Sequence, residues 1–105
     1  GAYNELRYRL KTYTIQSEFT KDGKTLPVKV ANLSDYRIDK FIIPTSIEKV
    51  SFGYGYAPSY TEYCYLGTKA DWESKVTVEG KPNKDIIVKC SDGEVTVKKQ
   101  ATENP

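Results

Sequence analysis

A chain of 105 residues of which 38% are hydrophobic holds enough apolar material for one compact domain, but not for two. The formal charge is only +2, from 16 basic and 14 acidic residues spread along the chain, which argues against a nucleic-acid partner and against binding to anionic lipid. The apolar run at residues 41–43 is far shorter than the about 18 residues needed to cross a bilayer, so we expect no membrane insertion.

The first predicted element is a β-hairpin. Apolar residues fall two apart between residues 3 and 19, with a break near residues 11–12, and an Asp22-Gly23 pair separates this run from residues 26–30. Asp-Gly strongly favours the tight hairpin turn that needs positive backbone dihedrals. Because Pro27 lacks an N–H, we expect the second strand to lie at a sheet edge or to begin after it. Residues 31–40 predict a turn or a short helix.

A short helix is predicted within residues 67–75. Thr68 is the expected N-cap, and Asp71, three residues later, is its partner in a capping box. Only about two turns fit before Val76, so Trp72 is the natural anchor of this helix on a sheet.

Residues 86–90 and 94–98 alternate like two strands and are joined by Ser91-Asp92-Gly93, which predicts a closing hairpin. Residues 101–105 carry no apolar anchor, so we expect them to form a flexible tail.

Residues 41–50, with Ile43-Pro44-Thr45-Ser46-Ile47 at their centre, resemble one unit of the bacterial surface-antigen leucine-rich repeat, the BspA-like family. The physical logic is that a short strand buries alternate residues, Pro44 stops it, and the following apolar residues turn back onto the neighbouring unit. A second match combines residues 65–73, with Gly-Thr-Lys before the tryptophan, and residues 88–93, with Cys-x-Asp-Gly. The resemblance covers residues 41–97 and implies the last repeat and cap of such an array.

The departures from the family shape the predicted fold. Only one clear Ile-Pro unit is present, whereas a repeat array needs about three units to bury a continuous core. We therefore predict a mainly β, or β-rich α+β, fold: a small single domain of hairpins with a truncated leucine-rich-repeat-like end and one short helix. It should span residues 1–100, with an N-terminal hairpin region at 1–40 that covers a repeat-like cap at 41–100.

Catalysis is not expected. The chain has no histidine, which removes the commonest general base and the commonest transition-metal ligand. Near pairs of carboxylates have structural explanations, such as Asp71 in the cap and Asp92 in the hairpin turn, and no calcium loop or phosphate-binding glycine motif is present. We predict no catalytic residues, no metal site and no cofactor.

Two cysteines, Cys64 and Cys90, allow at most one bridge, which would stabilise the fold by roughly 3 kcal/mol. The alternative is a pair of reduced, half-buried thiols, and a single pair does not decide between them.

Tyrosines are concentrated between residues 54 and 65. Tyr54, Tyr56 and Tyr60 are the candidate binding residues, because tyrosine offers a large contact area with a polar tip at little entropic cost. Tyr63 and Tyr65 are expected on a strand that packs against Trp72 or its neighbours.

The resemblance implies a non-catalytic interaction or adhesion module of a secreted or cell-surface bacterial protein, with a signal segment removed ahead of Gly1-Ala2. The ligand would be a protein or a glycan, and the domain is expected to be a monomer. A carbohydrate-binding module that uses the tyrosine-rich loop, and a purely structural cap of a repeat array, stay open as alternatives.

Overall fold

The structure is a computed structural model that describes residues 11–34, 38–52, 61–80, 82 and 84–99. Its strands form a five-stranded sheet in the order β1-β5-β7-β9-β10, a three-stranded sheet in the order β4-β6-β8, and a two-stranded hairpin of β2 and β3. One helix, α2, is described, so the predicted mainly β fold is confirmed. The elements are β1 Thr12–Thr14, β2 Glu18–Lys21, β3 Lys24–Pro27, β4 Val30–Asn32, β5 Lys40–Ile43, β6 Lys49–Ser51, β7 Glu62–Tyr65, α2 Lys69–Lys75, β8 Thr77–Glu79, β9 Ile86–Cys90 and β10 Gly93–Val97.

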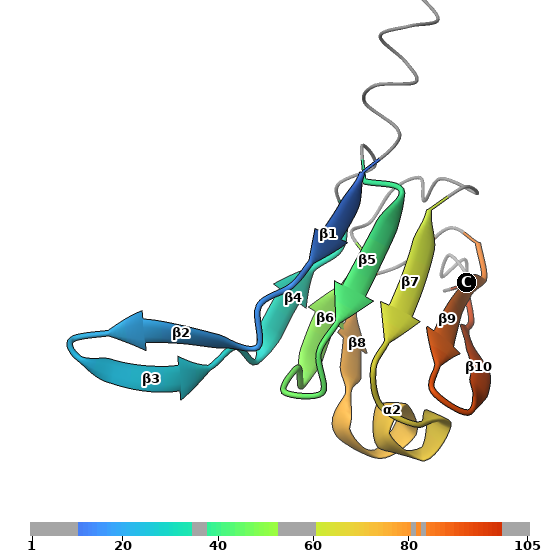
Figure 1. The fold of residues 1–105 in the computed structure, drawn as a ribbon. Coiled ribbons are helices and arrows are strands. Elements are labelled where there is room, and N and C mark those ends of the chain that lie inside the picture. The colour runs from blue at the N-terminus through green and yellow to red at the C-terminus, as the bar shows by residue number, and fades with distance from the viewer. Residues whose placement is uncertain (1–10, 35–37, 53–60, 81, 83, 100–105) are drawn as a thin grey trace, which may run out of the picture.

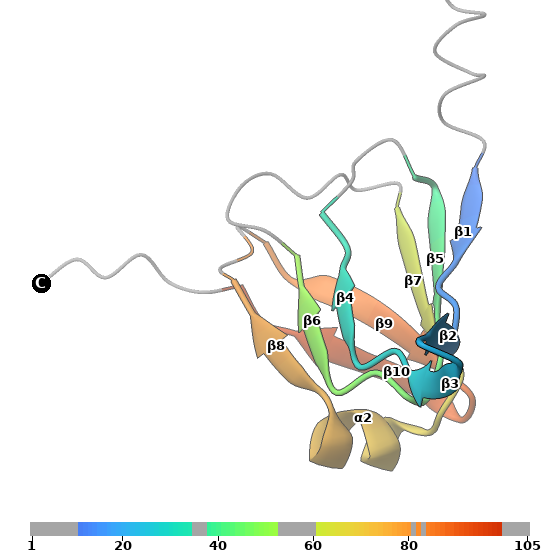
Figure 2. The same cartoon turned by 90° about the vertical axis from the view of Figure 1, so that its left-hand side faces the viewer.

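The chain alternates between the two larger sheets, which face each other across the core (Figure 2). We call one strand of the five-stranded sheet together with the next strand of the three-stranded sheet a coil. The three coils are β1 with β4, β5 with β6, and β7 with β8. Equivalent strands of successive coils pair in parallel, and β9 continues the larger sheet beside β7 before β10 turns back antiparallel to it.

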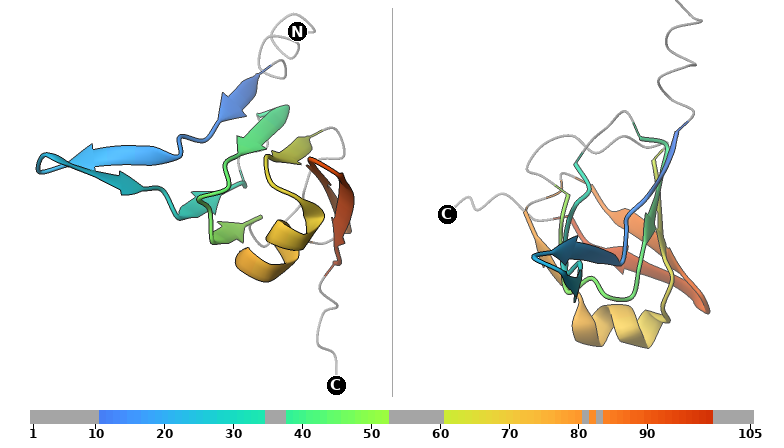
Figure 3. Two further views of the ribbon diagram at one scale, coloured as in Figure 1. Left: turned by 60° about the horizontal axis from the view of Figure 1, so that its bottom comes forward. Right: turned by 60° about the vertical axis from the view of Figure 1, so that its left-hand side comes forward.

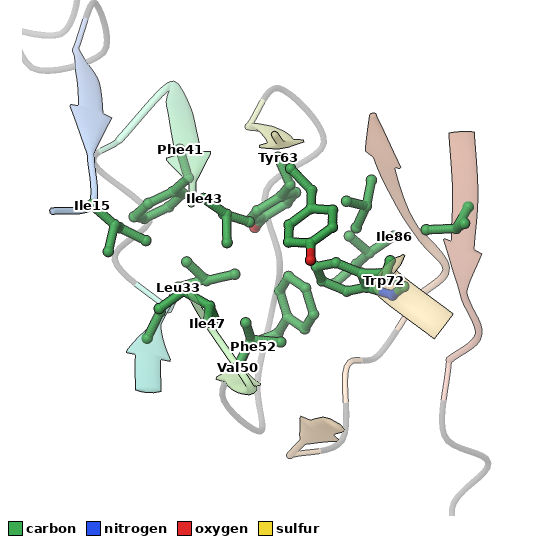
Figure 4. Close-up of a cluster of buried hydrophobic side chains, with 14 residues drawn as sticks. Ile15, Leu33, Phe41, Ile43, Ile47, Val50, Phe52, Tyr63, Trp72 and Ile86 are labelled. Carbon is green, nitrogen blue, oxygen red and sulfur yellow. The ribbon is translucent and has the colours of Figure 1, made fainter. Parts of the chain in front are cut away.

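The core lies between the sheets and is built from columns of equivalent residues (Figure 4). Tyr13, Phe41 and Tyr63 occupy neighbouring positions on β1, β5 and β7. The rings of Phe41 and Tyr63 are stacked with centroids 5.8 Å apart, and Phe52 meets Tyr63 edge-on at 5.0 Å. Aromatic pairs at such distances add to the free energy gained by burial, so each coil supports the next.

The segment that carries the family resemblance packs as its chemistry predicts. Phe41 and Ile43 are buried on one face of β5, which ends where Pro44 supplies no N–H. The chain then turns, and Ile47 and Val50 are fully buried. This second coil has neighbours on both sides, which explains why its apolar side chains are completely covered.

The β2–β3 hairpin projects away from the two larger sheets as an arm (Figures 1 and 3). Its turn has Asp22 at φ 53° and Gly23 at φ 76°, the positive values that a tight hairpin turn requires. Pro27 lies at the end of β3, opposite Glu18, in a two-stranded sheet where both strands are edges. The turn and the edge position of Pro27 therefore agree with the sequence prediction.

Helix α2 has the expected start. The Thr68 hydroxyl accepts a hydrogen bond from the Asp71 N–H at 3.0 Å, and the Asp71 carboxylate accepts one from the Thr68 N–H at 3.3 Å. Trp72 is 5% exposed, and its ring meets Tyr65 edge-on with centroids 5.3 Å apart. The helix is thus anchored to β7 by the side chain that the sequence singled out.

The start of α2 is joined directly to the turn of the β9–β10 hairpin. The Asp92 carboxylate accepts a hydrogen bond from the Lys69 N–H at 2.8 Å, and the Ser91 N–H donates to the Gly67 carbonyl at 2.8 Å. We call these two contacts the clamp. Residues 65–73 and 88–93 therefore act as one unit, because the hairpin turn satisfies a free N–H at the helix start.

Two predictions for the N-terminal part need correction. Residues 3–19 were expected to supply one strand of the hairpin, yet β1 is a separate strand in the large sheet, paired with β5. Residues 31–40 were expected to form a turn or a short helix, but Ala31 and Asn32 complete β4, which pairs with β6, while residues 35–37 lie outside the described residues. Within residues 11–34, β1 and β4 form the first coil of the two larger sheets, and β2 and β3 form the hairpin between them.

Candidate functional site

The tyrosines proposed for binding divide into two groups. Tyr54, Tyr56 and Tyr60 lie outside the described residues. Tyr63 and Tyr65 are 4% and 2% exposed on β7, as expected for core residues. Burial raises the pKa of the Tyr63 hydroxyl to about 12, so its neutral form is favoured inside the core.

Two of the described carboxylates, those of Asp71 and Asp85, accept backbone hydrogen bonds. Asp71 belongs to the cap of α2 and lies 3.7 Å from the Lys75 ammonium, and its hydrogen bond from the Thr68 backbone lowers its pKa. Asp85 accepts a hydrogen bond from the Lys99 N–H at 2.8 Å, which lowers its pKa. Among the described residues, no group of three or more cysteines and acidic side chains is arranged to hold a metal ion.

Cys64 and Cys90 are free thiols in the structure, and no disulfide joins them. Cys64 lies opposite Lys89 in the parallel pairing of β7 and β9, and directly opposite residues share one face of a sheet. Cys90 follows Lys89 on β9 and therefore points to the other face. Burial is the main cause that raises the pKa of the Cys90 thiol, which favours its protonated form.

One end of the two sheets is open. Strands β1 and β4 are outermost in their sheets, and each pairs with a neighbour on one side only among the described residues. In a parallel strand, alternate residues direct their N–H and C=O to opposite sides. Lys11 and Ile15 bond to the β5 segment, so the backbone groups of Thr12 and Thr14 point outward.

The same reasoning applies to β4. The Lys29 carbonyl accepts hydrogen bonds from the N–H groups of Glu48 and Lys49. The Leu33 N–H donates to the Ser51 carbonyl at the end of β6. The intervening residues Val30 and Asn32 therefore present their backbone groups to the outside. We call this end of the domain, with both outward-facing strand edges, the open end.

A groove of about 450 Å³ lies between the two edges. It is lined by Tyr13, Thr14, Ile15, Gln16, Val28, Val30, Ala31 and Asn32. Tyr13 is 53% exposed there, although Phe41 and Tyr63 in the same column are 2% and 4% exposed. The aromatic column of the core thus continues to the surface at the open end, where its last member is only half covered.

The arm adds apolar surface on the same side. It extends beyond β1 and β4, away from the rest of the fold (Figure 1). Phe19 and Leu26 are directly opposite each other across its two strands and are 44% and 39% exposed. Four of the six large exposed apolar side chains in the described chain therefore belong to β1, β4 and the arm.

The opposite end is covered differently. There β9 and β10 bring Ile86, Val88 and Val95 onto the core, and all three are buried. The clamp holds their turn against α2. At this end the five-stranded sheet finishes in an antiparallel hairpin packed over the core, whereas β8 is the outermost strand of the three-stranded sheet.

Sequence reasoning did not identify the open end. The local signal in this region was the alternation of apolar residues before Asp22. That alternation predicted a strand, and the strand was assigned to the hairpin. Whether a strand is inside a sheet or at its edge depends on the order of strands, and this order becomes visible only when β1 is paired with β5.

Comparisons with protein-family models, with curated proteins and with solved structures find no match to this chain. Within the described residues, no helix has the length and apolar character needed to cross a membrane.

Proposed function

We propose that this domain is a non-catalytic, polypeptide-binding module that closes a stack of β-coils and engages its partner through the open end. The observation that carries the proposal is the coincidence of two outward-facing strand edges with the half-exposed Tyr13 and the groove between them. Free strand edges add further strands readily, because each new strand satisfies a row of N–H and C=O groups.

The shape of the domain supports this role. At its far end the five-stranded sheet finishes in β9 and β10, whose turn the clamp holds against α2, and the carboxylates of Asp71 and Asp92 accept hydrogen bonds at the start of this helix. The resemblance of residues 41–97 to BspA-like leucine-rich repeats supports a setting in a secreted or cell-surface bacterial protein. An adhesion partner would be a protein on this view.

The test is selection from a displayed library of random linear peptides against the immobilised domain. We expect enriched peptides whose binding is lost in the Thr14→Pro variant, because proline at this position removes an outward N–H and leaves the bonds to β5 in place. The control is Thr14→Val, which keeps the N–H and should keep the binding.

Two results would contradict the proposal. One is a failure to enrich any peptide, and the other is binding that is equally strong in Thr14→Pro. A parallel glycan array addresses the carbohydrate alternative, because binding there without peptide binding would favour the tyrosine-rich loop as the site.

A further inference from the structure

We infer that the partner at the open end is itself a coil of the β5–β6 kind, a segment of a partner polypeptide that lays one strand beside β1 and a second beside β4. This inference rests on the proposed function and names the form in which the polypeptide binds. It follows from how the coils of this domain stack on one another.

The two edges require two strands at once. β1 and β4 belong to different sheets, and both are outermost at the same end. Each is only three residues long, so a single added strand would gain few hydrogen bonds. A segment that reaches both edges would form about twice as many backbone hydrogen bonds as a single added strand. It would also cover the groove between β1 and β4.

The direction of the added strands is set by the existing pairs. β1 pairs in parallel with β5, and β4 pairs in parallel with β6. A coil on the outer side continues the same arrangement when its strands are parallel to β1 and β4. Its side chain next to Tyr13 should be aromatic or a large aliphatic group, since Phe41 and Tyr63 fill the equivalent positions.

The second coil shows that such a segment can be paired on both sides. Its strands contact β1 and β4 along one edge and β7 and β8 along the other. The Glu48 carbonyl accepts from the Thr77 N–H, and the Ile43 carbonyl accepts from the Leu66 N–H. The edge that meets β7 and β8 is therefore the one that a copy of this coil would present to β1 and β4.

The arm supplies a lateral contact for the docked coil. It projects beyond the open end on the side where the coil would lie (Figures 1 and 3). A two-stranded hairpin alone is marginally stable in water, and here Lys21 and Lys24 are directly opposite, a like-charge pair that weakens it further. A coil that covers Phe19 and Leu26 would offset this weakness.

The probe is a synthetic peptide with the sequence of residues 38–52, titrated into the ¹⁵N-labelled domain. We expect saturable shifts at Thr12, Thr14, Val30 and Asn32 and at the Tyr13 ring. With the peptide at about ten times its dissociation constant, the edge is free about a tenth of the time, so hydrogen exchange at these amides should slow about tenfold.

Two N-methylated peptides provide matched controls. Backbone alternation puts the N–H groups of Phe41 and Val50 on the edge that natively meets β7 and β8, and those of Ile42 and Lys49 on the other edge. Methylation at Phe41 and Val50 should abolish binding, whereas methylation at Ile42 and Lys49 should leave it intact.

The outcomes separate this inference from the proposed function. Library peptides that bind the open end while the 38–52 peptide does not would overturn the inference and leave the proposed function standing. Equal binding by both methylated peptides would overturn the predicted pairing. Shifts at the same amides that depend on the concentration of the domain, without any peptide, would overturn the inference. They would indicate that the open end binds a second copy of this chain.

Discussion

Replacing Trp72 with alanine is expected to remove the main anchor between α2 and the five-stranded sheet. The side chain is 5% exposed and packs edge-on against Tyr65. Burying a tryptophan removes ~150–250 Å² from water, which at ~25 cal/mol per Å² gives an upper estimate of ~4–6 kcal/mol. Large-to-small substitutions of buried aromatic residues cost ~3–5 kcal/mol, and we expect the loss to lie in this range.

Such a loss is large for a single domain, because total stabilities are ~5–15 kcal/mol. The assay is urea unfolding followed by far-ultraviolet circular dichroism, since Trp72 is the only tryptophan and its fluorescence disappears with the substitution. With an m-value of ~1.5 kcal/mol/M, a cost of ~3 kcal/mol lowers the midpoint by about 2 M.

The matched control is Leu66→Ala, in the link between β7 and α2. Leu66 is 59% exposed, so its truncation should change the free energy of unfolding by less than ~0.5 kcal/mol. The reasoning is refuted if Trp72→Ala costs less than ~1 kcal/mol at an unchanged m-value, because the helix would then not depend on this contact.

Four further predictions concern the clamp, the turn before the helix, and the dependence of stability on pH through two ionisable groups. Asp92→Ala should cost ~0.5–2 kcal/mol in chemical denaturation, as expected for loss of a helix-start acceptor, and a zero effect would contradict the clamp. Gly67→Ala should destabilise severely, because a Cβ there would lie 2.6 Å from the Tyr65 ring; a melting temperature equal to that of the original chain would refute this. The Asp71 carboxyl has a lowered pKa in the fold, so its contribution is present above the ordinary value of 3.8 and is lost as the pH falls through the folded value. The Tyr63 pKa is raised from 10.0 to about 12, so stability should fall between these values as the pH rises, and a flat alkaline profile would contradict its burial.

Local chemistry in the sequence was enough to predict several elements. Asp22-Gly23 specifies a tight turn because its dihedrals are intrinsic to those two residues. Thr68 and Asp71 predict the start of α2 because a capping box involves neighbours only three apart. The β9–β10 hairpin follows from alternation on both sides of a short turn, so it too is a local structure.

The tertiary structure decided the short strands, their pairing partners and the contacts between distant residues. β1, β4, β6 and β8 have three residues each, too few for a periodic signal, and their partners lie far along the chain. The faces of the two cysteines depend on the register between β7 and β9, and the clamp joins Lys69 to Asp92 across 23 residues.

The candidate site belongs to this second class. An outward-facing strand edge is a property of the order of strands in a sheet, and no local pattern at Thr12 or Val30 records it. The sequence by itself therefore determined turns, caps and the β-rich class, because these depend on neighbouring residues. Only the tertiary structure decided the stacking of coils and the open end, because hydrogen bonds between distant parallel strands create them.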